Sequence, residues 1–367
     1  MRKRFHWIFV FTFIFLSSTL FAEDNSAVLL HARAREAFDQ GDYVQAEGYL
    51  RGVVYELDAR EATPALKALA SADLGSVLLA QSRSAEAEVL LNRAVNLLRS
   101  DPSIDSRHLP IVLGNLGRLH VFTGRWSQAE ADLKDALRLG GPVLGEHSLY
   151  VADWRSNLGM VYLAVGKKKH AARELQAALR IVEGGGVQNS ALVSALVNIA
   201  TLYYVKRDWR RAESALSRSL SIMEQSFPSR RLDISRTLGR LAFVCHAQKR
   251  SDEAEAFLRR ALALRREAMA DQGPDDAILS ALLANILASK GSDAEAEEIY
   301  GQALSAQERT LGPRSADVAS TLEGFATLLR RKNRQPLASE MESRAAAIRR
   351  ELDFTTSARG ARIWQLR

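Results

Sequence analysis

The chain has 367 residues, of which 47% are hydrophobic and 25% are charged, and its formal net charge is +7. This composition excludes an intrinsically disordered chain, because disorder requires few apolar residues and a high net charge. Three of the positive charges lie within the first four residues. The remaining chain is therefore too weakly basic to indicate nucleic-acid binding from charge alone.

Residues 1–22 have the layout of a secretory signal peptide. Basic residues at positions 2–4 precede an apolar run, and small polar residues lead to Ala22, after which we expect cleavage. Cleavage predicts a periplasmic or secreted bacterial protein. The alternative is an uncleaved anchor, because residues 5–22 approach the length that spans a bilayer. Retention predicts an inner-membrane protein that faces the periplasm.

One segment returns along the chain: GDYVQAEGYLRGVVYEL at 41–57, GRWSQAEADLKDALRL at 124–139 and RDWRRAESALSRSLSI at 207–222. Its alanine recurs at intervals of 41 or 42 residues, at Ala46, Ala87, Ala129, Ala171, Ala212, Ala254 and Ala296, with a degenerate eighth copy at Ala338. Twelve residues before each alanine stands another small residue: Ala34, Gly75, Gly117, Gly159, Ala200, Ala242, Ala284 and Ala326.

Each copy predicts a helical hairpin. The apolar residues of each half fall at helical spacing, and a glycine such as Gly41, Gly124 or Gly166 stands between the halves. The small residues are expected to let the two helices approach closely, while a leucine four residues after the alanine fills the space beside them. The predicted hairpins lie near 26–61, 62–104, 105–146, 147–188, 189–230, 231–272, 273–313 and 314–352.

The segments between and after the hairpins are predicted to be irregular. Gly140-Gly141-Pro142 and Gly184-Gly185-Gly186 are expected to be loops, and the glycine triplet lacks the ending of a phosphate-binding loop. The last helix carries Glu342 where inner copies place leucine, as a capping helix would. Residues 353–367 lose the pattern and are predicted to be a flexible tail.

The pattern resembles the tetratricopeptide repeat (TPR), in the longer variety found in kinesin light chains. The resemblance extends over about 26–351 and includes the segments LGPRSADVASTL at 311–322 and LGEHSLYVADWRSNLG at 144–159, which read like that family's connectors. It implies an all-α protein, with residues 23–352 forming a right-handed α-solenoid of about eight TPR hairpins.

The sequence shows no catalytic constellation. It has no HExxH, GxSxG or SxxK motif, and its seven histidines are scattered along the chain instead of clustering as zinc ligands do. Cys245 is the only cysteine and lies on an apolar helical stripe, so we expect a buried side chain and, as the alternative, a redox role. The sequence predicts no enzyme, cofactor or metal, and only a bound metal or cofactor would revive an enzyme class.

Asn115, Asn157 and Asn198 occupy the same position in three successive copies. Asparagine is unfavourable within a helix, because its amide competes for backbone hydrogen bonds. Helical geometry places this position on the side of the first helix away from the core pair. The alternative interpretation is that these side chains bridge neighbouring copies or face water. The position holds Asp73 in the second copy and Leu282 in the seventh.

The resemblance to TPR proteins implies that this side lines the inner, concave groove, where such asparagines bond the backbone of an extended peptide. It places further residues on the same surface: Arg118, Thr201, Arg236, Arg240 and His246. Arg236 and Arg240 would make that surface partly cationic and suited to an acidic or C-terminal carboxylate group.

The predicted function is therefore an exported, non-catalytic scaffold that binds a protein or peptide, not nucleic acid. The alternative is a membrane-anchored structural component of an envelope assembly, which contacts the membrane through its N-terminal segment alone.

Overall fold

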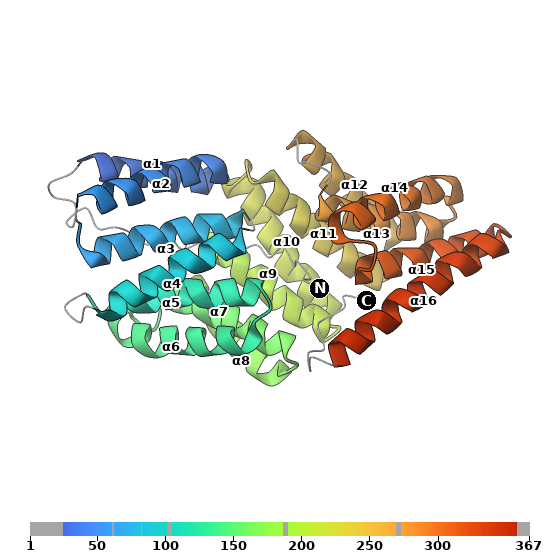
Figure 1. Ribbon diagram of the computed structural model, residues 1–367. Coiled ribbons are helices and arrows are strands. Elements are labelled where there is room, and N and C mark those ends of the chain that lie inside the picture. Colours follow the sequence, from blue (N-terminus) through green and yellow to red (C-terminus); the bar gives the residue numbers. More distant parts are fainter. Residues whose placement is uncertain are drawn as a thin grey trace. The chain divides into compact units, whose positions relative to one another are not determined.

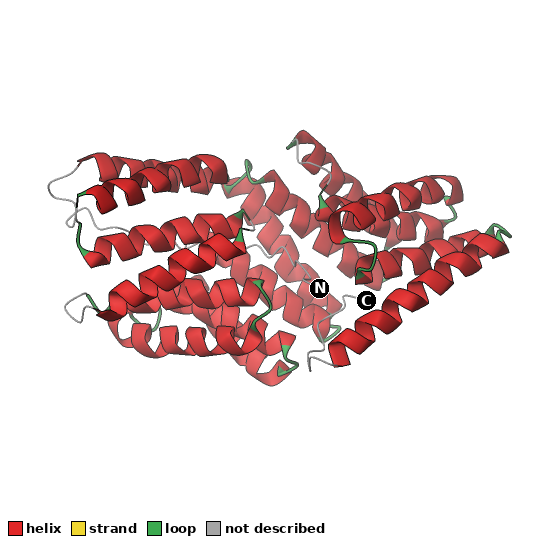
Figure 2. Cartoon of the chain, viewed as in Figure 1, coloured by secondary structure: helices red, strands yellow, loops and turns green. Residues whose placement is uncertain are grey.

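The computed structural model describes residues 25–60, 62–81, 83–100, 105–185, 190–268 and 273–357. Every regular element among these residues is an α-helix (Figures 1 and 2). The predicted signal peptide 1–22 and positions 358–367 of the predicted tail lie outside the described residues. No helix in the described part is long and apolar enough to cross a membrane.

The described residues form sixteen helices. Their bounds are α1 Asn25–Gln40, α2 Tyr43–Ala59, α3 Pro64–Ala80, α4 Ser84–Ser100, α5 His108–Phe122, α6 Trp126–Leu144, α7 Leu149–Ala164, α8 Lys168–Gly184, α9 Ser190–Val205, α10 Trp209–Ser226, α11 Arg231–Ala247, α12 Ser251–Glu267, α13 Pro274–Lys290, α14 Asp293–Leu311, α15 Ala316–Arg331 and α16 Gln335–Ser357. Each of the eight predicted hairpin ranges contains one consecutive pair of helices, except that the last helix extends to Ser357.

The chain divides into two compact units between Leu202 and Tyr203, within α9. We call them the N-terminal unit and the C-terminal unit. Helices pair as antiparallel hairpins from α1–α2 to α7–α8 in the N-terminal unit and from α11–α12 to α15–α16 in the C-terminal unit (Figure 1). The first helices of successive hairpins also contact each other: α3 contacts α5, α5 contacts α7, α11 contacts α13, and α13 contacts α15.

The predicted close approach of the two helices is confirmed at the glycine positions. A Cβ added to Gly117 would lie 2.8 Å from a side-chain carbon of Leu133, and one added to Gly159 would lie 2.6 Å from Leu175. The recurring alanines are buried with no exposed surface at Ala46, Ala87, Ala129, Ala171, Ala212, Ala254, Ala296 and Ala338. Two compact residues and one leucine thus form the core of the first six hairpins, whereas Tyr300 and Glu342 replace the leucine in the last two.

The turn inside seven of the eight hairpins uses a left-handed residue. Gly41, Gly124, Gly166 and Gly291 have φ between +73° and +85°, which glycine adopts without steric cost. The corresponding positions of three other repeats carry Arg207, Lys249 and Asn333, with φ of 59°, 63° and 60°. A side chain with a Cβ is disfavoured there, by about 1 kcal/mol.

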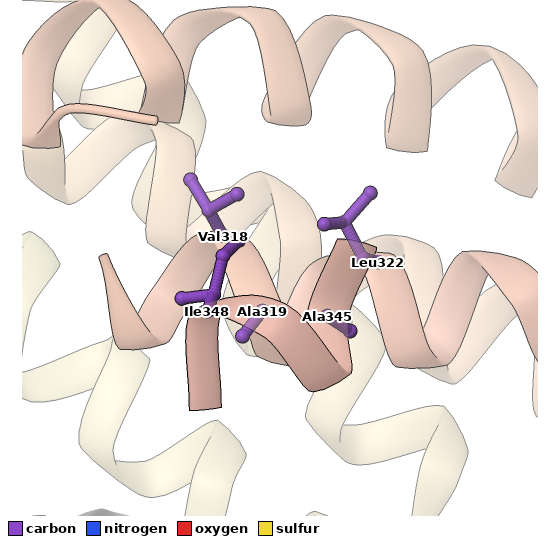
Figure 3. Packing of buried hydrophobic residues seen from close by; sticks show 5 residues of the cluster. All are labelled: Val318, Ala319, Leu322, Ala345 and Ile348. Carbon is purple, nitrogen blue, oxygen red and sulfur yellow. The ribbon is translucent and has the colours of Figure 1, made fainter. Parts of the chain in front are cut away.

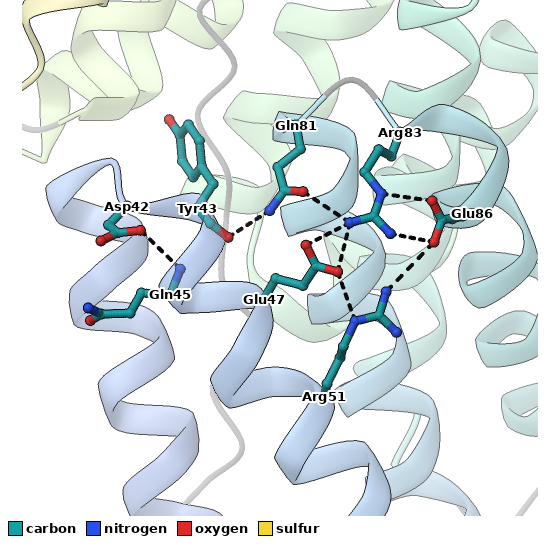
Figure 4. A network of polar contacts seen from close by, with 8 residues as sticks. All are labelled: Asp42, Tyr43, Gln45, Glu47, Arg51, Gln81, Arg83 and Glu86. Carbon is teal, nitrogen blue, oxygen red and sulfur yellow. Dashed lines mark hydrogen bonds and ion pairs between the residues drawn. The ribbon is translucent and has the colours of Figure 1, made fainter. Parts of the chain in front are cut away.

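The glutamate after the recurring alanine bonds to the turn of the next repeat. In the first rung, Glu47 accepts hydrogen bonds from Arg83 at 2.7 Å (Figure 4). Glu88 accepts from Arg125 at 2.6 Å, and these bonds hold the pKa of Glu88 below its usual range. We call the set the glutamate ladder; its other members are Glu130–Lys167, Glu213–Arg250, Glu255–Lys290 and Glu297–Lys332. The fourth repeat has Ala172 at this position and therefore no carboxylate.

The prediction that Gly140-Gly141-Pro142 forms a loop is wrong, because these residues lie in α6. Trp154 of α7 is 1% exposed and packs where a Cβ on Gly140 would lie 2.5 Å from its ring. A Cβ on Gly114 would lie 1.9 Å from the indole nitrogen. The two glycines therefore make room for an indole ring, which outweighs their local tendency to break a helix. Gly184 is likewise helical, as the last residue of α8.

The last hairpin closes the C-terminal unit. Val318, Ala319 and Leu322 of α15 pack against Ala345 and Ile348 of α16, as Figure 3 shows. At the leucine position of the inner repeats, Glu342 is partly exposed and accepts a bond from Arg330 of α15 at 2.6 Å. The helix thus covers the core and presents charge at this position, as predicted for a capping helix.

We predict that Gly114→Ala lowers the free energy of unfolding by about 1–3 kcal/mol, because the added methyl group overlaps Trp154. Urea unfolding followed by circular dichroism measures the change. The matched control is Gly48→Ala in α2, where no atom lies within 4 Å of the added Cβ. That control raises the free energy of unfolding by up to about 1 kcal/mol, because alanine favours helix over glycine. Equal effects at both positions would contradict the proposed overlap.

We predict that Arg207→Gly and Lys249→Gly each stabilise the protein by about 0.5–1 kcal/mol, because glycine relieves the left-handed backbone. Thermal and urea unfolding of each variant checks this. Arg218→Gly removes the same charge from the middle of α10 and is expected to lower stability by about 1 kcal/mol. The prediction fails if all three substitutions have the same sign.

Candidate functional site

The candidate site is a row of polar side chains on the first helices of the N-terminal unit. The predicted position of Asn115, Asn157 and Asn198 is shared by Asp73 of the second repeat, and His31 lies one residue before the equivalent Ala32 of the first repeat. We call these five residues the polar row. They come from α1, α3, α5, α7 and α9, and each is at most 8% exposed. Polar side chains are buried here at helix positions where an apolar residue would be easier to accommodate.

Hydrogen bonds join members of the row to neighbouring repeats. The amide nitrogen of Asn198 donates to Ser156 Oγ at 2.8 Å, and His31 Nε2 lies 2.8 Å from a carboxylate oxygen of Asp73. Arg118 Nη2 lies 3.4 Å from Ser76 Oγ. In each of these pairs the partners are 42 residues apart, which is one repeat. The alternative interpretation that asparagines bridge neighbouring copies therefore describes Asn198.

Asn115 and Asn157 bond within their own helices. Arg118 Nη2 donates to Asn115 Oδ1 at 2.9 Å, and the Asn157 amide donates to the backbone oxygen of Asp153 at 3.0 Å. The three asparagines therefore make three different sets of contacts, although they share one position in the repeat.

Arg118 and Asp153 add charge to the row. Arg118 has no exposed surface, and burial lowers its pKa. Burial also raises the pKa of Asp153 to about 6, against the opposing effects of the Arg118 charge and a hydrogen bond from Asn157. The guanidinium of Arg118 and the carboxyl group of Asp153 therefore lie in the same region of the protein. Each of them ionises less readily there than it would in water.

Thr201 also belongs to the N-terminal unit, but its hydroxyl donates to the backbone oxygen of Val197 at 3.0 Å. The other predicted residues are on α11 in the C-terminal unit. Arg236 donates to Asp275 at 3.0 Å and to Asp233 at 2.9 Å, so two carboxylates balance its charge. Burial, followed by the nearby charge of Arg236, lowers the pKa of Arg240 to about 10. His246 is partly buried, and burial lowers its pKa.

The structure thus groups the predicted residues into two sets. Asn115, Arg118, Asn157 and Asn198 lie on the first helices of the N-terminal unit, whereas Arg236 and Arg240 lie among acidic groups of the C-terminal unit. Sequence reasoning missed His31 and Asp153. Extending the register backwards by one period leads to Ala32, next to His31, and Asp153 stands one helical turn before Asn157, so both signals are weak.

Cys245 is buried with no exposed surface, and burial raises its pKa to about 11, so its thiolate is disfavoured. The prediction of a buried side chain is confirmed. Among the residues that the structure describes, no group of three or more His, Cys, Asp or Glu side chains could hold a metal ion.

Repeated helical hairpins of this kind place the chain in the class of helical-repeat scaffold proteins. The tetratricopeptide repeat family model matches residues 65–140, 109–184, 192–267 and 276–351, which together are more than half of the chain. The chain therefore belongs to the tetratricopeptide repeat family, as the resemblance predicted. This fold generally serves as a non-catalytic scaffold, and the comparisons indicate no enzyme family. No curated protein sequence matches the chain.

Solved structures support the fold. The apo form of the quorum sensor NprR from B. thuringiensis is 13% identical, and the match covers 88% of this chain and 87% of that chain with a TM-score of 0.61. The Rap conjugation gene regulator of plasmid pLS20, in complex with the Phr* peptide, is 16% identical over 83% of this chain and 78% of that chain, with a TM-score of 0.57.

A kinesin light chain from Podosopora anserina with nearly identical TPR-like repeats also matches. It is 18% identical over 55% of this chain and 96% of that chain, with a TM-score of 0.47.

We predict a pH-dependent stability that originates at Asp153. Below about pH 4 its carboxyl group is protonated in both the folded and the unfolded chain. As the pH rises, the unfolded chain releases this proton first, because the folded pKa is raised to about 6. The contribution of Asp153 to the free energy of unfolding therefore falls by up to about 3 kcal/mol between about pH 4 and pH 7 and then levels off.

Asp153→Asn removes this contribution, so the variant is expected to gain stability over the wild type as the pH rises through that range. Urea unfolding at a series of pH values measures the difference. Asp135→Asn, at a partly exposed carboxylate in α6, is the control and should follow the wild-type curve. Parallel curves for wild type and Asp153→Asn would contradict the assignment.

Proposed function

We propose that this protein is an exported, non-catalytic TPR adaptor that binds an extended peptide, or a peptide segment of a protein, along the polar row of the N-terminal unit. The observation that carries the proposal is the burial of asparagines at one position of three successive repeats. Buried amides are costly in a helix that could carry apolar residues, so a role in binding accounts for their presence better than folding does.

The chemistry of the row suits a peptide backbone. A side-chain amide offers both a donor and an acceptor, and a peptide unit presents the same two groups. One asparagine per repeat provides such a pair at regular intervals along the N-terminal unit. The similarity to the Rap regulator in complex with the Phr* peptide supports the same class of ligand.

A peptide on the row would replace contacts within the chain, except at the amide nitrogen of Asn115, which has no hydrogen-bond partner. Asn198 would exchange its bond to Ser156 for a bond to the ligand, and Asn115 would do the same with Arg118. Each exchange replaces one hydrogen bond by another, so its net cost is small. Arg118 and Asp153 would then contact polar groups of the peptide instead of their present neighbours within the chain.

Export is the part of this proposal that rests on the sequence of residues 1–22. Mass spectrometry of the protein from its native host identifies the mature N-terminus, and position 23 is the expected first residue. An intact N-terminus would instead support the alternative, a membrane-anchored component of an envelope assembly held by residues 5–22.

We predict that the triple variant Asn115→Ala, Asn157→Ala and Asn198→Ala binds the peptide at least tenfold more weakly than the wild type, because three amide contacts are lost. Affinity capture from the native envelope fraction identifies candidate segments. Synthetic peptides of those segments are then titrated against wild type and variant by fluorescence anisotropy.

The control replaces Asn92 and Asn96 with alanine. Both are exposed on α4, the second helix of its hairpin. It should bind the peptides as the wild type does. Circular dichroism and melting of all three proteins separate loss of binding from loss of folding. If the folded triple variant binds the peptides with wild-type affinity, the polar row is not the site.

A further inference from the structure

The C-terminal unit has an exposed row of cations at its first two hairpin turns. Lys206 and Arg207 lie in the turn before α10, Arg210 lies in the first turn of α10, and Lys249 lies in the turn before α12. All four side chains are exposed. We call this set the basic edge. Arg207 and Lys249 hold equivalent positions in successive repeats, so the cations lie along the same edge of the unit.

The acidic groups near the basic edge are bonded to other cations. Glu213 accepts from Arg250 at 2.7 Å, and Glu253 also bonds Arg250. Asp252 pairs with Lys290 at 2.5 Å, and Asp208 with Arg211 at 3.5 Å. Among the described residues, none of the ion pairs involves a member of the basic edge. Its four charges are therefore available to an external anion.

Two members of the basic edge occupy backbone positions that favour glycine. Arg207 and Lys249 have φ of 59° and 63° where other repeats place Gly124, Gly166 or Gly291. Keeping a long basic side chain there costs stability. Folding alone accounts for a glycine at these positions and gives no reason for a cation. A role outside the fold is the simpler explanation for both residues.

The aromatic side chains next to the basic edge are engaged within the protein. Trp209 packs against Tyr204 with ring centroids 5.1 Å apart, and Arg211 lies over the ring of Tyr203 at 5.7 Å. They do not form the exposed stacking platform that single-stranded nucleic acid uses. Flexible lysines and arginines at successive turns instead suit a broad anionic surface. Each side chain can add to the electrostatic attraction without a fixed binding geometry.

We propose that the basic edge docks the C-terminal unit on the anionic headgroups of a phospholipid bilayer. The sequence supplies a second argument for this partner. The apolar run 5–22 is predicted to direct the chain to a bilayer, whether that run is cleaved during translocation or retained as an anchor. This surface belongs to the C-terminal unit and is independent of the peptide-binding proposal for the N-terminal unit.

Vesicle flotation of the full-length protein tests the proposal. The probes are vesicles of phosphatidylcholine alone and of phosphatidylcholine mixed with phosphatidylglycerol. The test variant carries Lys206→Gln, Arg207→Asn, Arg210→Gln and Lys249→Asn, where asparagine tolerates the left-handed backbone. We expect the wild type to bind the anionic vesicles more strongly than the neutral ones. The test variant should lose at least tenfold of that binding to anionic vesicles.

The control variant removes four exposed positive charges from other parts of the C-terminal unit: Arg231→Gln, Arg266→Gln, Arg314→Gln and Arg350→Gln. It has the same net charge as the test variant and should retain wild-type binding. Any contribution of residues 5–22 is common to all three proteins, and it appears as binding to the neutral vesicles. Circular dichroism verifies that each protein is folded.

Three results would overturn the proposal. The first is equal binding of the wild type to neutral and anionic vesicles, and the second is an equal loss in the test and control variants. The third is obtained with soluble polyanions: if the basic edge binds RNA or poly-glutamate while the anionic vesicles do not bind, its partner is not a bilayer. Raising the salt concentration should weaken the anionic-vesicle binding of the wild type and leave that of the test variant little changed.

Discussion

The structure depends on the close contact between the two helices of each hairpin. Two helices can approach this closely only where compact residues lie at the contact. At Gly117 little space remains, because an added Cβ would overlap the side chain of Leu133. This contact buries an apolar stripe that neither helix could bury alone. Its repetition at 41 or 42 residues fixes the positions of all other features, including the glutamate ladder and the polar row.

The sequence predicted what is repeated and local. The helical pairs and their turns follow from apolar spacing and from residues such as Gly124, because both signals act within one hairpin. The pairing of Glu88 with Arg125 was missed, since it depends on how one repeat is placed against the next. The loop predicted at Gly140 and Pro142 is helical instead, because packing of Trp154 outweighs their local preference for a loop.

The candidate site was predictable in its position but not in its surroundings. Periodicity placed Asn115, Asn157 and Asn198 on one side of the first helices. It could not show that Asn198 reaches Ser156, or that Asp153 is buried beside Arg118, because these contacts depend on side-chain conformations between repeats. The same row therefore joins two properties: it links neighbouring repeats, and it holds polar groups at a cost to folding that ligand contacts can offset.

The bonds of the glutamate ladder join partners that are separated by a nearly constant number of residues. If recombination removed the block from about 105 to 146, Glu88 would meet Lys167 in place of Arg125, and a carboxylate would still face a cation. Duplicating such a block would likewise preserve the pairing. This part of the glutamate ladder is thus compatible with the gain or loss of a whole period at the level of the gene.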